Sequence, residues 1–89
     1  MLGSDYEIKA HPEFLDDIEK LDKELLGQIY KAIEKLKKDP LRYKHLRGTN
    51  FYRIRLEKYR MIYSVYEKGV RLLIFGKRDK IYREMKNRI

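Results

Sequence analysis

Apolar and charged residues alternate over the stretch 51–75, and this alternation constrains the fold more than any other feature of the chain. In a β-strand successive side chains point to opposite faces. Within the opening run, FYRIRLE at 51–57, Tyr52, Ile54 and Leu56 therefore line one apolar face, and the other face carries Arg53, Arg55 and Glu57. The pattern resumes at 60–66, and a third run at 70–75 follows the turn at Lys68–Gly69. Three such runs in succession predict a three-stranded antiparallel meander.

The first half of the chain predicts one strand and two helices. Residues 6–10 alternate, so we expect a short strand that pairs with the meander. The pair His11–Pro12 then favours a helix start, because proline suits the first helical position. Two apolar stripes at helical spacing follow, with a bend at 22–24 between them and a stop at Asp39–Pro40. The stripes consist of Phe14, Ile18, Leu21 and Leu25 in the first helix, and of Leu26, Ile29, Ile33 and Leu36 in the second.

The remaining segments predict a loop and a short terminal helix. Residues 41–50 are of mixed polarity and end in turn residues, so we expect a loop with Leu46 as a buried anchor. After the meander, Asp79 can cap a helix whose apolar side is Tyr82, Met85 and Ile89. We therefore expect an α+β fold: an N-terminal strand, two antiparallel helices, the three-stranded antiparallel meander and a short C-terminal helix. A chain of 89 residues has room for one modest core, which predicts a single domain over residues 1–89.

Charge is distributed unevenly along the chain. Residues 1–45 carry nine Lys and Arg against ten Asp and Glu, a net charge of −1, whereas residues 46–89 carry thirteen against four, a net charge of +9. Eight of the nine arginines lie in this second half, and the planar guanidinium group matches phosphate oxygens in geometry. The pattern favours a nucleic-acid partner; a solvated basic surface and an acidic protein partner are the alternatives.

Several kinds of site are disfavoured by what the sequence contains. There is no cysteine, the two histidines are far apart, and the five glycines stand singly, so we expect no metal site, no phosphate-binding glycine loop and no cofactor. No apolar run is long enough to span a membrane and the start does not resemble a leader, which predicts a cytoplasmic protein without membrane contact. Asp16 and Asp17 diverge on a helix, so we interpret them as a solvated acidic face and not as a catalytic pair.

The order of the elements and four short basic segments resemble the RelE/ParE superfamily of bacterial and archaeal toxin–antitoxin toxins, over almost the whole chain. The segments are Leu46-Arg47-Gly48, Tyr52-Arg53-Ile54-Arg55, Tyr59-Arg60-Met61-Ile62-Tyr63 and Gly76-Lys77-Arg78, the last followed by Tyr82. On this scaffold RelE-like members cleave messenger RNA on the ribosome, whereas ParE-like members poison DNA gyrase.

The resemblance to the RelE-like branch implies a ribosome-dependent, metal-independent mRNA endoribonuclease that inhibits translation. Such toxins enter the ribosomal A site, where the 2′-hydroxyl of the bound codon attacks the adjacent phosphate and leaves a cyclic phosphate and a free 5′-hydroxyl. The resemblance assigns phosphate stabilisation to Arg60 and Arg78, and base stacking or proton transfer to Tyr82. The RNA-binding residues that it implies are Arg53, Arg55, Lys77 and Arg47.

The same resemblance implies further partners and leaves two alternatives open. A cognate antitoxin protein is expected to cover the cationic face, and the ribosome and mRNA are the expected targets. Arginine stands at positions 53 and 55, where RelE-like members often have lysine, and arginine stays protonated in proteins. The alternatives are a ParE-like DNA gyrase inhibitor and a catalytically silent domain that binds ribosome or RNA.

Overall fold

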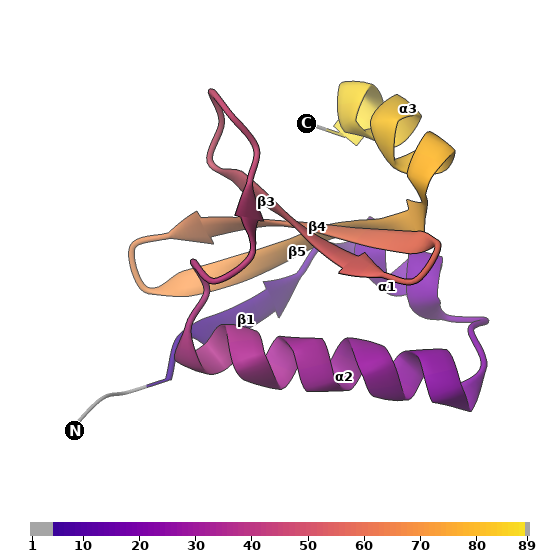
Figure 1. The fold of residues 1–89 in the computed structure, drawn as a ribbon, viewed down its shortest axis with the longest axis horizontal. Helices are drawn as coiled ribbons and strands as arrows, with labels where there is room; N and C mark the ends of the chain where they lie inside the picture. The colour runs from indigo at the N-terminus through magenta and orange to yellow at the C-terminus, as the bar shows by residue number, and fades with distance from the viewer. Residues whose placement is uncertain (1–4, 89) are drawn as a thin grey trace.

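The expected meander is present in the computed structural model, which describes residues 5–88. Strands β3 (Phe51–Leu56), β4 (Tyr59–Tyr66) and β5 (Gly69–Lys77) are consecutive and antiparallel. The expected N-terminal strand is β1 (Glu7–Ala10), which pairs in parallel with β5. A further strand, β2 (Lys44–His45), pairs with β3 inside the segment for which we expected a loop. The sheet therefore has the order β1-β5-β4-β3-β2 (Figure 1).

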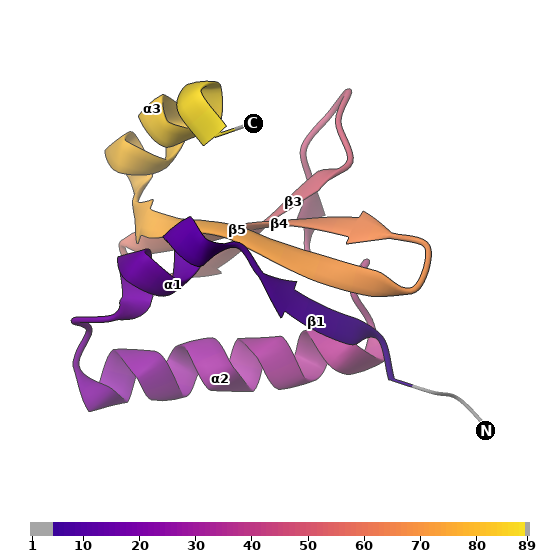
Figure 2. The same cartoon turned by 180° about the vertical axis from the view of Figure 1, so that it is seen from behind.

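The first two helices begin where the sequence predicts, but the first one is shorter than expected: it ends at Ile18, so Leu21 lies between the helices and Leu25 belongs to the second. Helix α1 (Pro12–Ile18) starts at the proline, and the His11 side chain accepts a hydrogen bond from the backbone N–H of Glu13. Helix α2 (Lys23–Lys38) is capped by Asp22, whose carboxylate accepts the N–H of Leu25 at 2.8 Å. Between the two helices the chain reverses, and α2 runs back beneath the sheet (Figure 2).

The terminal helix differs from the expectation in its first residue. Helix α3 (Arg78–Arg88) already includes Asp79, which lies in its first turn and is not the residue before it. Negative charge in the first turn still complements the helix dipole. The residue expected on the apolar side at the very end, Ile89, lies outside the described residues.

The helices lie on opposite faces of the sheet. Helices α1 and α2 cover one face, whereas α3 lies over the other (Figures 1 and 2). The larger core fills the space between the first two helices and the sheet; its buried residues include Phe14, Leu25, Ile29, Leu36, Ile54, Met61, Tyr63 and Phe75. A smaller core under α3 consists of Ile62, Ile74 and Ile81, with Leu46, Phe51, Leu73 and Met85 packed against it. Strands β3, β4 and β5 contribute apolar residues to both cores, so these three strands are apolar on both faces.

Tyr63 connects the larger core to the loop after α2 through a hydrogen bond. Because its hydroxyl can ionise, it also makes the free energy of unfolding depend on pH. Its side chain is fully buried and its hydroxyl donates to the carbonyl of Pro40 at 2.7 Å. Burial, and then the neighbouring Tyr52 and Tyr43, raise the pKa of Tyr63 well above its usual value. An unfolded tyrosine ionises near pH 10. The contribution of protonated Tyr63 to the free energy of unfolding is therefore complete below about pH 10 and is lost as the pH rises above that value.

Replacing Tyr63 by phenylalanine should lower the free energy of unfolding at pH 7 by about 1–2 kcal/mol, because the Pro40 carbonyl loses its donor. Above pH 10 the free energy of unfolding of the wild type should also fall by up to about 1.4 kcal/mol per pH unit, because Tyr63 ionises in the unfolded chain. Tyr63→Phe should not show this fall. Urea denaturation at pH 7, 10 and 11 measures both effects. Tyr30→Phe, at a tyrosine that is 56% exposed, is the control. If the free energies of unfolding of wild type and Tyr63→Phe change in parallel with pH, the raised pKa of Tyr63 would be contradicted.

Over residues 5–88, every helix is too short or too polar to cross a membrane.

Candidate nucleic-acid interface

Strand register places three arginines on the face of the sheet that carries α3. Arg55 lies opposite Arg60 across β3 and β4, and Arg53 lies opposite Ile62, a residue of the smaller core under α3. Directly paired residues of antiparallel strands point to the same face. Arg53, Arg55 and Arg60 therefore share one surface, as the alternation predicted for the two residues of β3.

Arg60 is held by the turn between β3 and β4. Its Nη1 donates to the carbonyl of Tyr59 at 2.9 Å and to the carbonyl of Glu57 at 3.0 Å. Glu57 has a φ of 55°, a left-handed conformation that is uncommon for a residue with a side chain. The turn therefore presents two carbonyl oxygens to one guanidinium group, and this geometry limits the positions that the group can adopt.

The charges around Arg60 show which side chains are its neighbours. Desolvation, and then the positive charges of Arg55, Arg53 and Arg78, lower the pKa of Arg60 from its usual value, while Tyr82 acts in the opposite direction. Three cations and one phenol therefore lie within electrostatic reach of Arg60. Mutual repulsion of this kind is unfavourable in the free protein and is relieved when an anion binds.

Helix α3 contributes Arg78 and Tyr82 to this surface. Arg78 is the first residue of α3, and Tyr82 follows four positions later, so both lie on one side of the helix. The Tyr82 hydroxyl accepts a hydrogen bond from Nη1 of Arg53 at 3.3 Å. Tyr82 is 47% exposed, whereas its neighbour Ile81 is buried and anchors the helix. Tyr82 is therefore free to contact a ligand and is not a core residue.

Two of the residues expected to bind RNA lie apart from this group. Arg47 is exposed in the loop between β2 and β3. Lys77 pairs with Tyr59, whose ring stacks on Phe75 in the larger core, so its register places it toward the opposite face. The structure thus brings together five of the seven expected residues, which we call the cationic face: Arg53, Arg55, Arg60, Arg78 and Tyr82. Their functional roles remain predictions.

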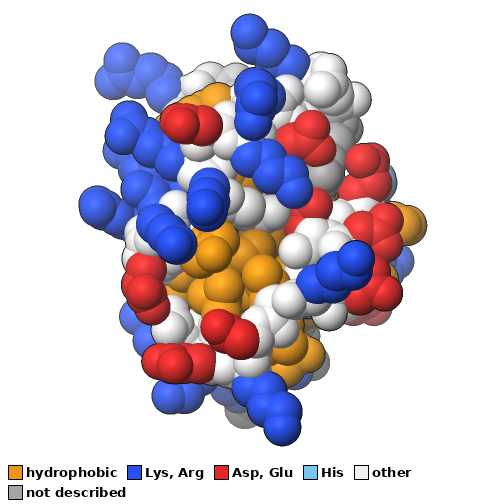
Figure 3. Space-filling view, turned by 90° about the vertical axis from the view of Figure 1, so that its right-hand side faces the viewer, with side chains coloured by type: hydrophobic (Ala, Val, Ile, Leu, Met, Phe, Trp, Pro, Cys, Tyr) orange, Lys and Arg blue, Asp and Glu red, His pale blue; other side chains and the backbone are white. Residues whose placement is uncertain are grey.

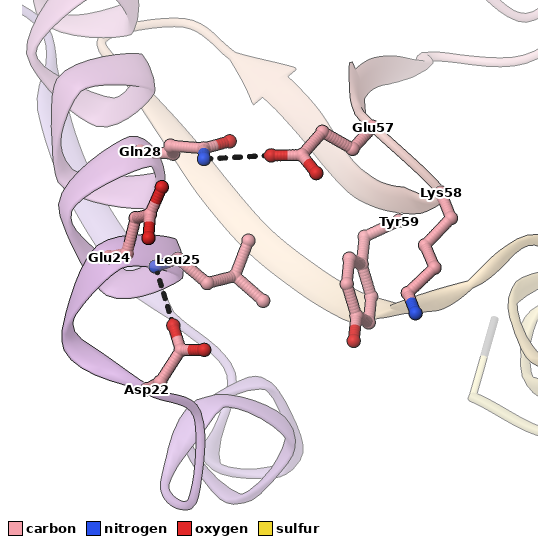
Figure 4. Close-up of a pocket in the computed structure, with 7 residues that line it drawn as sticks. All are labelled: Asp22, Glu24, Leu25, Gln28, Glu57, Lys58 and Tyr59. Carbon is pink, nitrogen blue, oxygen red and sulfur yellow. Dashed lines mark hydrogen bonds between the residues drawn. The ribbon is translucent and has the colours of Figure 1, made fainter.

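The cationic face adjoins a pocket of different character. Lys and Arg side chains gather toward the α3 side of the molecule, and a hollow with a hydrophobic floor lies below them (Figure 3). A pocket of about 250 Å³ opens between the start of α2 and the β3–β4 turn (Figure 4). Its lining residues are Asp22, Glu24, Leu25, Gln28, Glu57, Lys58 and Tyr59. With three carboxylates against one lysine, the pocket does not suit phosphate, so we place the candidate interface on the open cationic face.

One side of that pocket supports Arg60 indirectly. The Gln28 amide on α2 donates to the Glu57 carboxylate at 2.9 Å, which ties α2 to the turn whose carbonyls hold Arg60 (Figure 4). The sequence carries no local signal for this contact, because 29 residues separate the two partners.

Asp17 was wrongly expected on a solvated face. Its carboxylate is only 5% exposed and accepts the backbone N–H of Phe75 at 3.0 Å. Its neighbour Asp16 is exposed, as expected. Adjacent positions on a helix diverge by about 100°, so one residue of the pair faces the sheet and the other faces solvent.

Within residues 5–88, no three His, Asp or Glu side chains come together in a way that would hold a metal ion. The expectation that the chain needs no metal remains a prediction.

Comparisons with known proteins place this geometry in context. A family model described as the ParE toxin of the type II toxin–antitoxin system parDE matches residues 8–82. A search of curated protein sequences found no match.

Among solved structures, the chain is similar to the isolated RelE toxin of E. coli, with 28% identity, a TM-score of 0.74 and coverage of 93% of this chain and 97% of that chain. A mutant of E. coli RelE in the free state is 26% identical, with a TM-score of 0.81 and coverage of 96% and 98%. The toxin in the intact E. coli RelBE toxin–antitoxin complex is 27% identical, with a TM-score of 0.74 and coverage of 81% and 95%.

Proposed function

The chain belongs to the ParE toxin family, within the RelE/ParE superfamily of toxins of type II toxin–antitoxin systems, and from this premise we propose that it is a ribosome-dependent mRNA endoribonuclease. The observation that supports this proposal is the cationic face, where four guanidinium groups and one tyrosine hydroxyl gather on the α3 side of the sheet. An open surface of arginines fits a single-stranded RNA backbone better than it fits a small molecule, which needs an enclosed pocket.

The proposed reaction needs charge stabilisation more than it needs a cofactor. The 2′-hydroxyl oxygen attacks the adjacent phosphorus, and the bond from phosphorus to the 5′-oxygen of the next nucleotide breaks. The products are a 2′,3′-cyclic phosphate and a 5′-hydroxyl, which takes up the proton that the attacking hydroxyl loses. Negative charge grows on the phosphate oxygens in between, and in this proposal Arg60 and Arg78 stabilise it.

The other members of the cationic face have positioning roles in this proposal. Arg53 and Arg55 hold neighbouring phosphates, and the exposed Tyr82 ring stacks on a base. The hydrogen bond from Arg53 to the Tyr82 hydroxyl sets the ring against the strand. Because an arginine stays protonated, Arg53 and Arg55 act by orientation and charge and do not remove the 2′-hydroxyl proton as a base.

A cognate antitoxin is the proposed protein partner. The E. coli toxin with 27% identity has been solved in a toxin–antitoxin complex. We propose that the antitoxin of the present chain neutralises the cationic face, because a partner that covers it relieves the repulsion among its arginines.

Mapping the 5′ ends of mRNA in a translating extract tests the proposal. Wild-type protein should create new ends inside A-site codons, and these ends should become ligatable only after phosphorylation, because the reaction leaves a 5′-hydroxyl. The Arg60→Ala, Arg78→Ala double mutant should create none. Inhibited translation without new ends would show binding without cleavage and would contradict the proposal.

A second candidate function is inhibition of DNA gyrase, favoured by the match to the ParE toxin model over residues 8–82. It predicts DNA breaks in a gyrase supercoiling reaction and intact mRNA in the translating extract. Running both assays on one preparation separates the two functions.

A further inference from the structure

Asp17 completes hydrogen bonding at the edge of β5 where no strand is present. Pairing between β1 and β5 ends with Ala10 opposite Leu72, and the His11 N–H still donates to the Leu72 carbonyl at 2.9 Å. Helix α1 then follows in place of the strand. Beyond the end of β1, the Asp17 carboxylate accepts the hydrogen bond from the Phe75 N–H at 3.0 Å, which a neighbouring strand would otherwise accept. A side chain thus replaces a strand at the point where β5 leads into α3.

The second oxygen of the same carboxylate reaches the first turn of α3. Asp17 Oδ1 lies 3.4 Å from Nζ of Lys80, whose side chain is 45% exposed. The Lys80 side chain passes close to Gly76, where a Cβ would lie 3.0 Å from Cδ of Lys80. Phe75 and Lys80 bracket Arg78, so one carboxylate holds the chain on both sides of that arginine.

Arg78 needs such a restraint because its neighbours repel it. It lies close enough to Arg60 to lower the pKa of Arg60, together with Arg55 and Arg53. Among the described residues of α3, Ile81 is the fully buried anchor, and Met85 is a partly buried residue packed against the same core. Without a tether, repulsion would move the first turn of α3 away from the sheet.

We infer that Asp17 is a positioning residue for Arg78: its carboxylate holds the end of β5 and the first turn of α3 to α1, and so sets the Arg78 guanidinium group on the cationic face. The inference rests on the proposed function, in which Arg78 stabilises the reacting phosphate. A displacement of about 1 Å in such a group can cost roughly a hundredfold in rate.

Asp17→Asn is the central variant, because an amide oxygen can still accept the Phe75 N–H while the charge that holds Lys80 is lost. Lys80→Met removes the other half of the ion pair and keeps most of the aliphatic chain. We expect each variant to lower the maximal rate of mRNA cleavage about tenfold. The concentration of programmed ribosomes that gives half of the maximal rate should change by less than about twofold. Asp16→Asn, the same change at the exposed neighbour, should leave both values unchanged.

A double-mutant cycle distinguishes positioning from general destabilisation. If Asp17 acts through Arg78, then Asp17→Asn should cause no further loss of cleavage in an Arg78→Ala background. A full tenfold loss in that background would overturn the inference.

Amide hydrogen exchange tests the tether without any ribosome. Asp17→Ala should speed exchange at Phe75 and at the α3 amides from Ile81 onward, the first with a helical acceptor, whereas Met61 in the middle of the sheet should keep its protection. If wild-type protein cleaves no mRNA, the proposed function fails while the exchange data still decide on the tether. Unchanged exchange at Phe75 and α3 would overturn the inference even if the protein is an active nuclease.

Discussion

Replacing Arg60 by alanine is expected to slow mRNA cleavage by about a hundredfold or more. Arg60 lies at the centre of the cationic face, where Arg55, Arg53 and Arg78 all act on its pKa. The carbonyls of Glu57 and Tyr59 fix its guanidinium group before any ligand binds, so its charge needs little reorganisation during the reaction. Single-turnover cleavage on programmed ribosomes, with toxin in excess, measures the loss at the chemical step.

Two variants identify the origin of that loss. Arg71→Ala removes the same charge from β5, at a side chain that lies over the Tyr66 ring and outside the cationic face, and it should retain cleavage within about threefold of wild type. Arg60→Lys keeps the charge but loses the planar guanidinium group with its paired N–H donors. We therefore expect a cleavage rate between those of wild type and Arg60→Ala. Equal losses for Arg60→Ala and Arg71→Ala would assign the effect to overall charge and would contradict a specific role for Arg60.

Replacing Phe14 by alanine is expected to lower the free energy of unfolding by about 3–5 kcal/mol. Phe14 is 1% exposed and is the residue through which α1 is buried in the larger core. Domains of this size are stable by about 5–15 kcal/mol, so the variant should keep only part of its stability. The midpoint of thermal unfolding should fall by about 12–40 °C. Circular dichroism during urea and thermal unfolding measures both values.

The neighbouring Leu15 is a matched control for this prediction. Leu15 is 52% exposed, and Leu15→Ala should change the free energy of unfolding by no more than about 0.5 kcal/mol. Similar losses for the two variants would mean that α1 does not depend on Phe14 for its packing. A large loss for Phe14→Ala alone would also show how firmly α1, and with it Asp17, is attached to the sheet.

The sequence was sufficient to predict every described element except β2, and the common face of two arginines. Strand alternation and helix periodicity are local properties, so β3, α2 and the face shared by Arg53 and Arg55 follow from neighbouring residues alone. The strand β2 was missed because two exposed residues carry no alternation, and they form a strand only by pairing with β3.

One correction arises from long-range packing. Asp17 was wrongly expected in solvent, because its partners Phe75 and Lys80 are 58 and 63 residues away in the chain. Long-range pairing also places Lys77, opposite Tyr59, away from the cationic face, and its role in RNA binding stays a prediction.

The sequence by itself determined the fold class, the apolar stripes and the concentration of arginine, since these depend on composition and local periodicity. Only the tertiary structure decided how Arg78 and Tyr82 meet the arginines of β3 and β4. A regular strand would place Leu72 and Ile74 on one face, but the register shift opposite Ile62 and Tyr63 puts Leu72 in the larger core and Ile74 in the smaller one. The physical reason for that shift is pairing and packing between distant segments, which no local pattern records.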